Sequence, residues 1–164
     1  MTTLASSDMG YFDDVAFFED LESGAEIECG SQTLSETDIV EFARQYDPLS
    51  MHVDPERAQA GPYDGLIASG YHTLSETVGL LVEHSRGGRA VVAGLGIDDV
   101  RWHRPVRPGD TIAPTMTITD RRPAEGPPDA GVVTLEIVVE NGDGDTVLSY
   151  DDAELVRRQG GDGR

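Results

Sequence analysis

Asp47 and His52 are the residues best suited to acid/base chemistry, and they lie five positions apart. Because Pro48 disfavours helical geometry in the residue before it, we expect Asp47 to lie in the exit turn of a helix. The segment 48–51 is then expected to be a loop or tight turn that can bring both side chains to one spot. A carboxylate and an imidazole that share one water form a general acid/base pair. The same two residues are also compatible with a turn cap and a structural histidine.

The backbone N–H of Gly70 is a second candidate group. Gly70 lies in the run 65–73, where a long helix is predicted to begin. The first N–H groups of a helix lack intrahelical partners and lie at the positive end of its dipole, so they can stabilise a developing oxyanion. The missing side chain lets a substrate carbonyl approach closely. The alternative is that Gly70 serves only close packing of the helix against a sheet.

The helices that must position these groups have clear start and stop signals. Residues 35–38 read Ser-Glu-Thr-Asp, a pattern similar to a capping box, and apolar residues follow at helical spacing up to Tyr46. Asp54-Pro55 predicts a short helix over 55–60, and 61–65 is predicted to be a loop. The long helix is predicted from Gly70 to about 86–88, with an apolar stripe made of Leu74, Val78, Leu81 and Val82.

The second half of the chain is predicted to form strands. Alternation and β-branched residues favour strands over 90–95, 97–104, 111–119, 133–140 and 146–155, and a short one over 25–29. Pro114 suggests a bulge or an edge. Helices early and strands late predict an α+β domain, with an antiparallel sheet wrapped around one long central helix. The 164 residues suit one domain over 11–156, with flexible ends at 1–10 and 157–164.

The composition is strongly acidic. The net charge is −19, and arginine occupies all 12 basic positions. Such a surface suits the salt-loaded cytoplasm of a halophile, because about 1 M salt shortens the Debye length to about 3 Å, although an acidic mesophilic protein remains the alternative. Nucleic acid is not an expected partner, since a basic footprint is missing. Neither a membrane span nor a signal peptide is predicted, so we expect a cytoplasmic protein.

Metal and cofactor signals are weak. Asp47, His52 and Asp54 could be read as a metal cluster, but the chain has no HExxH or CxxC pattern. Gly94 and Gly96 lack the third glycine and the following helix of a dinucleotide-binding loop. We therefore expect no metal and no bound cofactor.

Three blocks of the sequence resemble a known family. Residues 42–55, FARQYDPLSMHVDP, are similar to the hydratase motif of the MaoC-like dehydratases and (R)-specific enoyl-CoA hydratases. Residues 65–73 match a second block, and residues 104–110 resemble a third that the wider hot-dog class also uses. The resemblance runs from about Phe12 to Val156. Leu49 and Ser50 stand where the motif has asparagine and proline.

The resemblance implies a hot-dog fold and an acyl-CoA substrate. It assigns Asp47 and His52 as the catalytic pair and the Gly70 N–H as the group that binds the thioester oxygen. The implied reaction is reversible hydration of a trans-2-enoyl-CoA to an (R)-3-hydroxyacyl-CoA, at a site in a homodimer or higher homo-oligomer. Ser75, near the first turn of the long helix, is a candidate substrate-binding hydroxyl.

Two other functions stay open on sequence grounds. A hot-dog thioesterase would direct the water at the thioester carbonyl instead of C3 and would release CoA thiol. A noncatalytic acyl-CoA-binding subunit is compatible with the departures at Leu49 and Ser50. Because CoA carries phosphates, local arginines are expected at the mouth of the site, and Arg101, Arg104 and Arg107 are the candidates.

Overall fold

The computed structural model describes residues 12 and 14–160, and in these ranges the helices precede the long strands. The short and long helical elements are η1 (Phe18–Asp20), α1 (Glu36–Tyr46), α2 (Ser50–Val53), α3 (Pro55–Gln59), α4 (Gly70–His84) and η2 (Arg86–Gly88). The strands are β1 (Glu26–Glu28), β2 (Gln32–Thr33), β3 (Val91–Trp102), β4 (Thr111–Pro123), β5 (Ala130–Glu140) and β6 (Thr146–Arg157).

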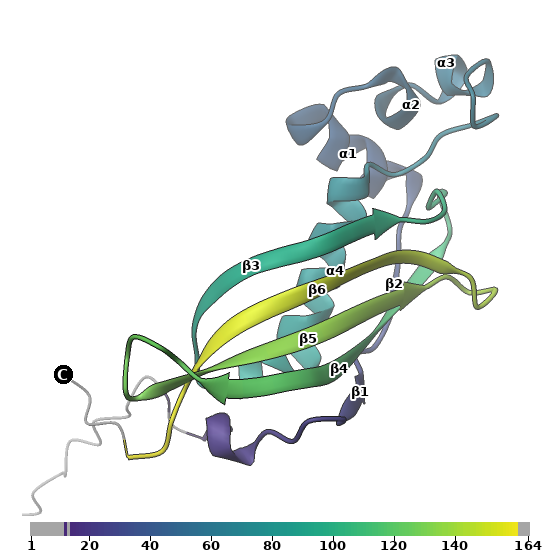
Figure 1. The fold of residues 1–164 in the computed structure, drawn as a ribbon. Helices are drawn as coiled ribbons and strands as arrows, with labels where there is room; N and C mark the ends of the chain where they lie inside the picture. The colour runs from purple at the N-terminus through teal and green to yellow at the C-terminus, as the bar shows by residue number, and fades with distance from the viewer. Residues whose placement is uncertain (1–11, 13, 161–164) are drawn as a thin grey trace, which may run out of the picture.

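The strands form one antiparallel sheet with α4 lying along one face (Figure 1). The order is β1-β4-β5-β6-β3, and β2 pairs with β4 beside β1. Figure 1 also shows α1, α2 and α3 grouped beyond the end of the sheet where α4 begins. The predicted α+β arrangement, an antiparallel sheet around one long helix, is confirmed, and its core lies between α4 and the sheet.

The predicted start of α1 is confirmed. Ser35 Oγ accepts a hydrogen bond from the Asp38 N–H, and the Asp38 carboxylate accepts one from the Ser35 N–H, at 3.1 Å and 2.9 Å. The predicted short helix at Asp54-Pro55 is confirmed as α3, which Asp54 caps through the Arg57 N–H.

The prediction of a loop over 48–51 was wrong at its end. Ser50 begins the four-residue helix α2, so His52 lies on a helix. The Leu49 carbonyl accepts hydrogen bonds from the N–H groups of His52 and Val53, at 2.9 Å and 3.2 Å. These backbone bonds build the turn although no side chain caps α2.

The face that α4 packs on the sheet also differs from the predicted stripe. The residues buried against the sheet are centred on Thr73, Thr77 and Leu81, whereas Val82 is 45% exposed. The Thr77 hydroxyl is satisfied by the Thr73 carbonyl at 2.8 Å, which lets a polar side chain lie inside. The predicted apolar stripe is therefore only partly used by the core.

Two predictions about the strands need correction. The segments 90–95 and 97–104 form one irregular strand, β3, whose pairing with β6 shifts register at three places. Pro114 lies inside the sheet and at no bulge, since it pairs with Val139 in an unshifted stretch of β4. On its other side the chain passes from β1 to β2, where the missing N–H of Pro114 costs no ladder bond.

The domain boundaries can be compared at the C-terminal end. We expected a flexible tail from 157, but β6 includes Arg157, and Arg158 Nε donates to Glu19 Oε1 at 2.9 Å. The Gln159 N–H donates to the other Glu19 oxygen, also at 2.9 Å, so the ordered part runs further than predicted. The expected flexible ends at 1–10 and 161–164 lie outside the described residues.

Within residues 12 and 14–160, no helix is both long enough and apolar enough to traverse a bilayer.

Candidate active site

The structure brings Asp47 and His52 together at the junction of α1 and α2. Asp47 ends α1 with φ −152° and ψ 69°, which turns its side chain away from the helix axis. His52 Nε2 lies 3.5 Å from Asp47 Oδ2. The imidazole is buried and the carboxylate is partly exposed, so the pair lies at the boundary between the protein interior and the solvent.

The tautomer of His52 follows from its other nitrogen. Nδ1 lies 2.8 Å from the carbonyl oxygen of Ile67, and because a carbonyl only accepts, Nδ1 carries the hydrogen and donates it. In the neutral form of the ring, Nε2 carries the lone pair and faces the Asp47 carboxylate. Two acceptors at this separation are suited to share one water, which can donate a hydrogen to each of them.

Ser69 is a site residue that the sequence analysis did not single out. Its hydroxyl donates to Asp47 Oδ2 at 2.7 Å and accepts from the Tyr71 N–H at 3.3 Å. Ser69 is fully buried and is also the N-cap of α4. One hydroxyl therefore ties the carboxylate at the end of α1 to the start of α4. Its position directly before the predicted helix was the signal for a cap, but nothing local indicated Asp47 as its partner.

Gly70 is the first residue of α4, as predicted. Among the described residues, no hydrogen bond uses its N–H, in keeping with the free donors of a helix start. Its carbonyl accepts from Trp102 Nε1 at 2.9 Å, and a Cβ on Gly70 would lie 2.6 Å from the indole ring. Close packing, the alternative explanation for this glycine, is therefore present together with a free N–H.

A cavity of 390 Å³ opens beside these groups. Its lining includes His52, Gly70, Trp102 and Val106. Asp47 is not a lining residue, and it contacts the lining residue His52. The walls combine apolar side chains with a few polar groups, as in sites that bind small molecules.

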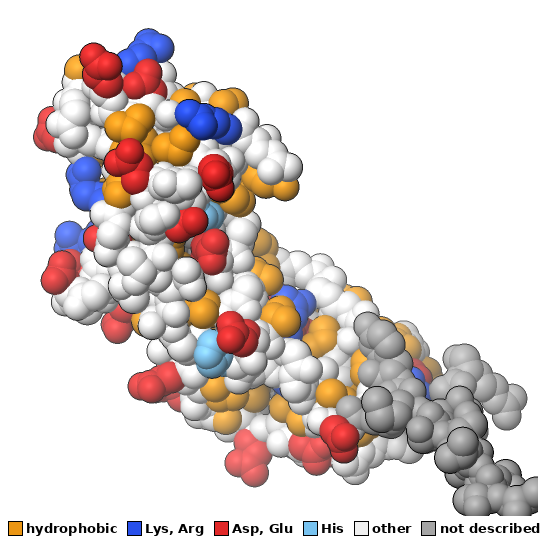
Figure 2. All heavy atoms as spheres, turned by 180° about the vertical axis from the view of Figure 1, so that it is seen from behind, with side chains coloured by type: hydrophobic (Ala, Val, Ile, Leu, Met, Phe, Trp, Pro, Cys, Tyr) orange, Lys and Arg blue, Asp and Glu red, His pale blue; other side chains and the backbone are white. Residues whose placement is uncertain are grey.

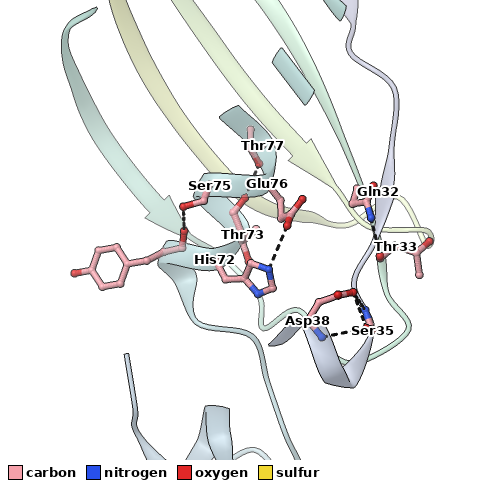
Figure 3. A network of polar contacts seen from close by, with 10 residues as sticks. Gln32, Thr33, Ser35, Asp38, His72, Thr73, Ser75, Glu76 and Thr77 are labelled. Carbon is pink, nitrogen blue, oxygen red and sulfur yellow. Dashed lines mark hydrogen bonds and ion pairs between the residues drawn. The ribbon is translucent and has the colours of Figure 1, made fainter. Parts of the chain in front are cut away.

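Ser75 is not brought into this cavity. It is exposed on α4, and its hydroxyl donates to the Tyr71 carbonyl at 2.8 Å, as Figure 3 shows. The neighbouring His72 faces α1 instead of the cavity and stacks on Phe42 with ring centroids 4.5 Å apart. His72 Nε2 lies 3.4 Å from Glu76 (Figure 3), and burial lowers the pKa of His72 although Glu76 opposes the shift.

The candidate arginines differ in their surroundings. Arg104 lines the cavity and is exposed, with Asp145 at 3.6 Å. Arg107 donates to the Tyr63 carbonyl at 2.7 Å, which fixes the loop that borders the cavity. Arg101 is exposed and lies 3.7 Å from Asp99. Arg104 is the one of the three that lines the cavity.

Within residues 12 and 14–160, no group of three or more His, Cys, Asp or Glu side chains is arranged to hold a metal ion. The chemistry that the described site can perform with its own groups is proton transfer through Asp47 and His52, next to a helix N–H that can stabilise negative charge on oxygen.

The chain is similar to known proteins over most of its length. Residues 22–141 match the MaoC like domain family. The uncharacterized protein YdeM of Bacillus subtilis is 30% identical over 128 residues, which cover 78% of this chain and 89% of YdeM.

Two solved structures are similar in both sequence and shape. The monoamine oxidase regulatory protein of Archaeoglobus fulgidus is 33% identical with a TM-score of 0.81, over 88% of this chain and 96% of that one. The MaoC-like dehydratase of Rhodospirillum rubrum is 31% identical with a TM-score of 0.79, over 88% of this chain and 98% of that one. With its antiparallel sheet around α4 and its match over residues 22–141, the chain belongs to the MaoC-like dehydratase family and has the hot-dog fold.

Proposed function

We propose that this protein is an (R)-specific enoyl-CoA hydratase, which reversibly adds water to a trans-2-enoyl-CoA to give a 3-hydroxyacyl-CoA. The observation that carries the proposal is the pairing of Asp47 with the Nε2 lone pair of His52, beside the free N–H of Gly70. This arrangement supplies the two functions that hydration needs, proton transfer and stabilisation of an oxyanion.

The reaction follows from the positions of these groups. The thioester carbonyl withdraws electrons from the C2–C3 double bond, which makes C3 electrophilic. A water that hydrogen-bonds to both Asp47 and His52 gives a proton to the pair while its oxygen bonds to C3. The negative charge moves to the thioester oxygen, which accepts a hydrogen bond from the Gly70 N–H. The pair, titrating as a unit, then returns the proton to C2.

A named relative supports the hydratase reaction class. The mesaconyl-CoA hydratase of Haloarcula marismortui is 33% identical over 66 residues, which make up 40% of this chain and 18% of that protein. Because the match covers a small part of that protein, the relative supports the type of chemistry and leaves the acyl group of the substrate open.

The departures at Leu49 and Ser50 do not separate the catalytic pair. The Leu49 carbonyl starts α2 through two backbone bonds, so the turn that carries His52 does not depend on these two side chains. This is the observation that favours catalysis over a noncatalytic acyl-CoA-binding role.

The substrate's CoA moiety is expected to bind at Arg104. This guanidinium is exposed at the cavity on a protein of net charge −19, where an anionic phosphate otherwise meets repulsion.

We also propose that the protein is a homodimer in which β3 meets β3 of a second copy. In the described part of the chain, β3 pairs with β6 on one side and with no strand on the other. The edge strand exposes Val92, Leu95 and Ile97, each by about half. An open edge with apolar side chains is a pairing surface unless a partner covers it.

The test of the proposed reaction is the loss of the enoyl-thioester ultraviolet absorbance of crotonyl-CoA in molar KCl, with a thiol reagent assayed in parallel. The wild type should remove the absorbance without releasing thiol. Asp47→Asn and His52→Gln should each lower kcat by about 10²- to 10⁴-fold, because each removes a member of the acid/base pair. Separation of the product enantiomers then tests the (R) assignment.

Matched controls exist in the same chain. Asp143→Asn in the β5–β6 turn and His84→Gln at the end of α4 change the same residue types at exposed positions away from the cavity, and both should keep wild-type rates. Thiol release would indicate the thioesterase instead. Binding of acyl-CoA without turnover of crotonyl-CoA, longer or branched enoyl-CoAs would indicate the noncatalytic subunit.

A further inference from the structure

A second hollow, of 280 Å³, lies between α4 and β3, outside the lining of the catalytic cavity. Leu74 and Val78 line it from α4, and Gly96 and Ile97 line it from β3. Figure 2, which shows the molecule from behind, has basic side chains next to hydrophobic ones on this face. The apolar stripe that sequence patterning predicted for the core therefore faces this hollow in part.

The catalytic cavity and the hollow border successive turns of α4. Gly70, Leu74 and Val78 are spaced four residues apart and share one helix face. Leu74 and Val78 lie about 6 Å and about 12 Å beyond Gly70 along the axis. On β3, Trp102 borders the catalytic cavity and Ile97, earlier on the same strand, borders the hollow. A thioester whose carbonyl binds at Gly70 and whose acyl chain follows this face of α4 would bring the far end of the chain to the hollow.

The hollow has polar residues in its lining, namely Arg86, Tyr150 and Asp152. Arg86 Nε lies 2.8 Å from Glu154 Oε1, while its Nη1 lies 3.8 Å from Asp152 Oδ2, which is a loose contact. The Tyr150 residue is 3% exposed, and its hydroxyl has no hydrogen-bond partner among the described residues. Buried hydroxyls without a partner are rare and costly.

Arg86 shares Glu154 with a second arginine. Arg89 donates two hydrogen bonds to Glu154, at 3.1 Å and 2.9 Å, and both side chains are buried. Arg86 contacts the same carboxylate through Nε, but it is partly exposed and lines the hollow. Its Nη1 atom, which among the described residues has only the 3.8 Å contact to Asp152, is the group that we expect to reach a ligand.

We propose that the hollow receives the far end of the acyl chain, and that the preferred substrate carries there a hydrogen-bond-accepting oxygen, bound by Arg86 and Tyr150. This inference rests on the proposed hydratase function and names the substrate class for the same site. A chain ending in a methyl group would cover Arg86 and leave the Tyr150 hydroxyl without a partner, whereas a hydroxyl or carboxyl oxygen accepts hydrogen bonds from both.

The charges around the hollow are mixed, since Arg86 contacts both Asp152 and Glu154. Burial raises the pKa of Asp152, and Arg86 and Arg89 oppose this shift. The distance from Gly70 to Leu74 and Val78, about 6 to about 12 Å along the helix axis, indicates how long the acyl chain should be. An extended covalent chain advances roughly 3.6 Å for every three bonds, so this distance corresponds to roughly five to ten bonds.

The experiment compares trans-2-enoyl-CoA thioesters of one length, roughly eight carbons, that end in a methyl, a hydroxyl or a carboxyl group. The readout is kcat/KM from the loss of enoyl absorbance. The wild type should prefer at least one oxygen-terminated chain by about tenfold over the methyl-terminated chain, as expected for one or two hydrogen bonds. The hydroxyl and carboxyl arms distinguish the two sources of the oxygen.

Two variants test whether Tyr150 and Arg86 cause the preference for oxygen-terminated chains. Tyr150→Phe deletes one oxygen atom that has no partner, so the fold should be retained while the preference ratio falls about fivefold or more. Arg86→Gln should lower the same ratio, while Arg122→Gln, an exposed arginine on β4, should leave it at the wild-type value.

The outcomes separate the two proposals. If wild-type enzyme hydrates crotonyl-CoA but handles the methyl-terminated chain as well as the oxygen-terminated ones, the inference about the hollow is overturned alone. A ratio that Tyr150→Phe leaves unchanged overturns it as well. If no enoyl thioester is hydrated, the proposed function itself has failed.

Discussion

At the scale of single residues, the site depends on a few hydrogen bonds that hold acceptors in place. The Ile67 carbonyl sets the tautomer of His52, and Ser69 orients the Asp47 carboxylate. Ile67 contacts the ring nitrogen of His52 that is not paired with Asp47, and Ser69 donates to the Asp47 oxygen that lies 3.5 Å from His52 Nε2. Ser69 and Ile67 are therefore positioning residues for the proposed reaction.

Ser69→Ala should lower kcat by about tenfold with little change in KM, because the carboxylate loses the donor that orients it and an interaction of about 1.4 kcal/mol corresponds to tenfold. The free energy of unfolding of the variant should also be about 1 kcal/mol lower, since Ser69 caps α4. Steady-state kinetics on crotonyl-CoA and urea unfolding measure the two effects.

Ser69→Thr provides the control for this prediction. Threonine keeps a hydroxyl that can donate to Asp47 and cap α4, so it should restore most of kcat and of stability. If Ser69→Ala loses stability but keeps full kcat, Ser69 serves the helix alone.

The lowered pKa of His72 leads us to predict that the stability of the protein depends on pH. Burial lowers its pKa below the ordinary value, so as the pH falls through about 6.5 the unfolded chain takes up a proton before the folded one does. Stability should therefore fall from pH 7.5 to pH 5.5. His72→Phe keeps a ring stacked on Phe42 but cannot titrate, so its free energy of unfolding should fall less over this range. Urea unfolding at both pH values, at constant KCl, compares the two; equal losses would contradict the prediction.

At the scale of elements, α4 serves the core and the site with different faces. Thr73, Thr77 and Leu81 are buried, while Gly70 lines the catalytic cavity and Leu74 and Val78 line the hollow beside β3. Helical periodicity alone does not distinguish two such faces, because both contain apolar residues. The face with Gly70, Leu74 and Val78 is where the substrate is proposed to lie.

Two glycines of α4 give a matched pair of variants. In Gly70→Ala the new Cβ would lie 2.6 Å from the Trp102 ring, so the variant should lose about 1 to 3 kcal/mol of stability and much of its activity. In Gly79→Ala the new Cβ meets nothing within 4 Å, so the same change should stabilise the helix by up to about 1 kcal/mol and leave the rate unchanged. Thermal unfolding and initial rates on both variants test the assignment; a neutral Gly70→Ala would refute it.

At the scale of the whole molecule, the acidic surface and the open edge of β3 act in opposite directions. A net charge of −19 on each copy opposes association, whereas the half-exposed apolar side chains of β3 favour it. Screening at about 1 M salt, where the Debye length is about 3 Å, removes most of the repulsion. The proposed dimer should therefore be stronger at high salt.

Leu95→Glu tests the proposed dimer. The side chain is 53% exposed in a single copy, so the charge should not disturb the fold, but it should shift the molecule from dimer to monomer by introducing a desolvated charge into the interface. Light scattering after size exclusion in molar KCl measures the mass. Ala113→Glu adds the same charge at an exposed position of β4 and should remain dimeric. A dimeric Leu95→Glu would exclude β3 as the interface.

The sequence by itself determined the features that depend on neighbouring residues. The capping box at Ser35, the helix end at Asp47, the helix start at Gly70 and the alternating strands could be predicted because caps, proline and side-chain alternation act over a few positions. The same local signals placed Asp47 and His52 near each other, since only four residues separate them.

Only the tertiary structure decided the contacts between distant residues. Ser69 meets Asp47 across 22 positions, and Ile67 meets His52 across 15, so neither bond had a local signal. The packing face of α4 and the grouping of Arg86 with Tyr150 depend in the same way on how the helix lies against β3 and β6. Helix and strand patterns specify which side chains share a face, but the partner of that face is set by packing of the whole domain.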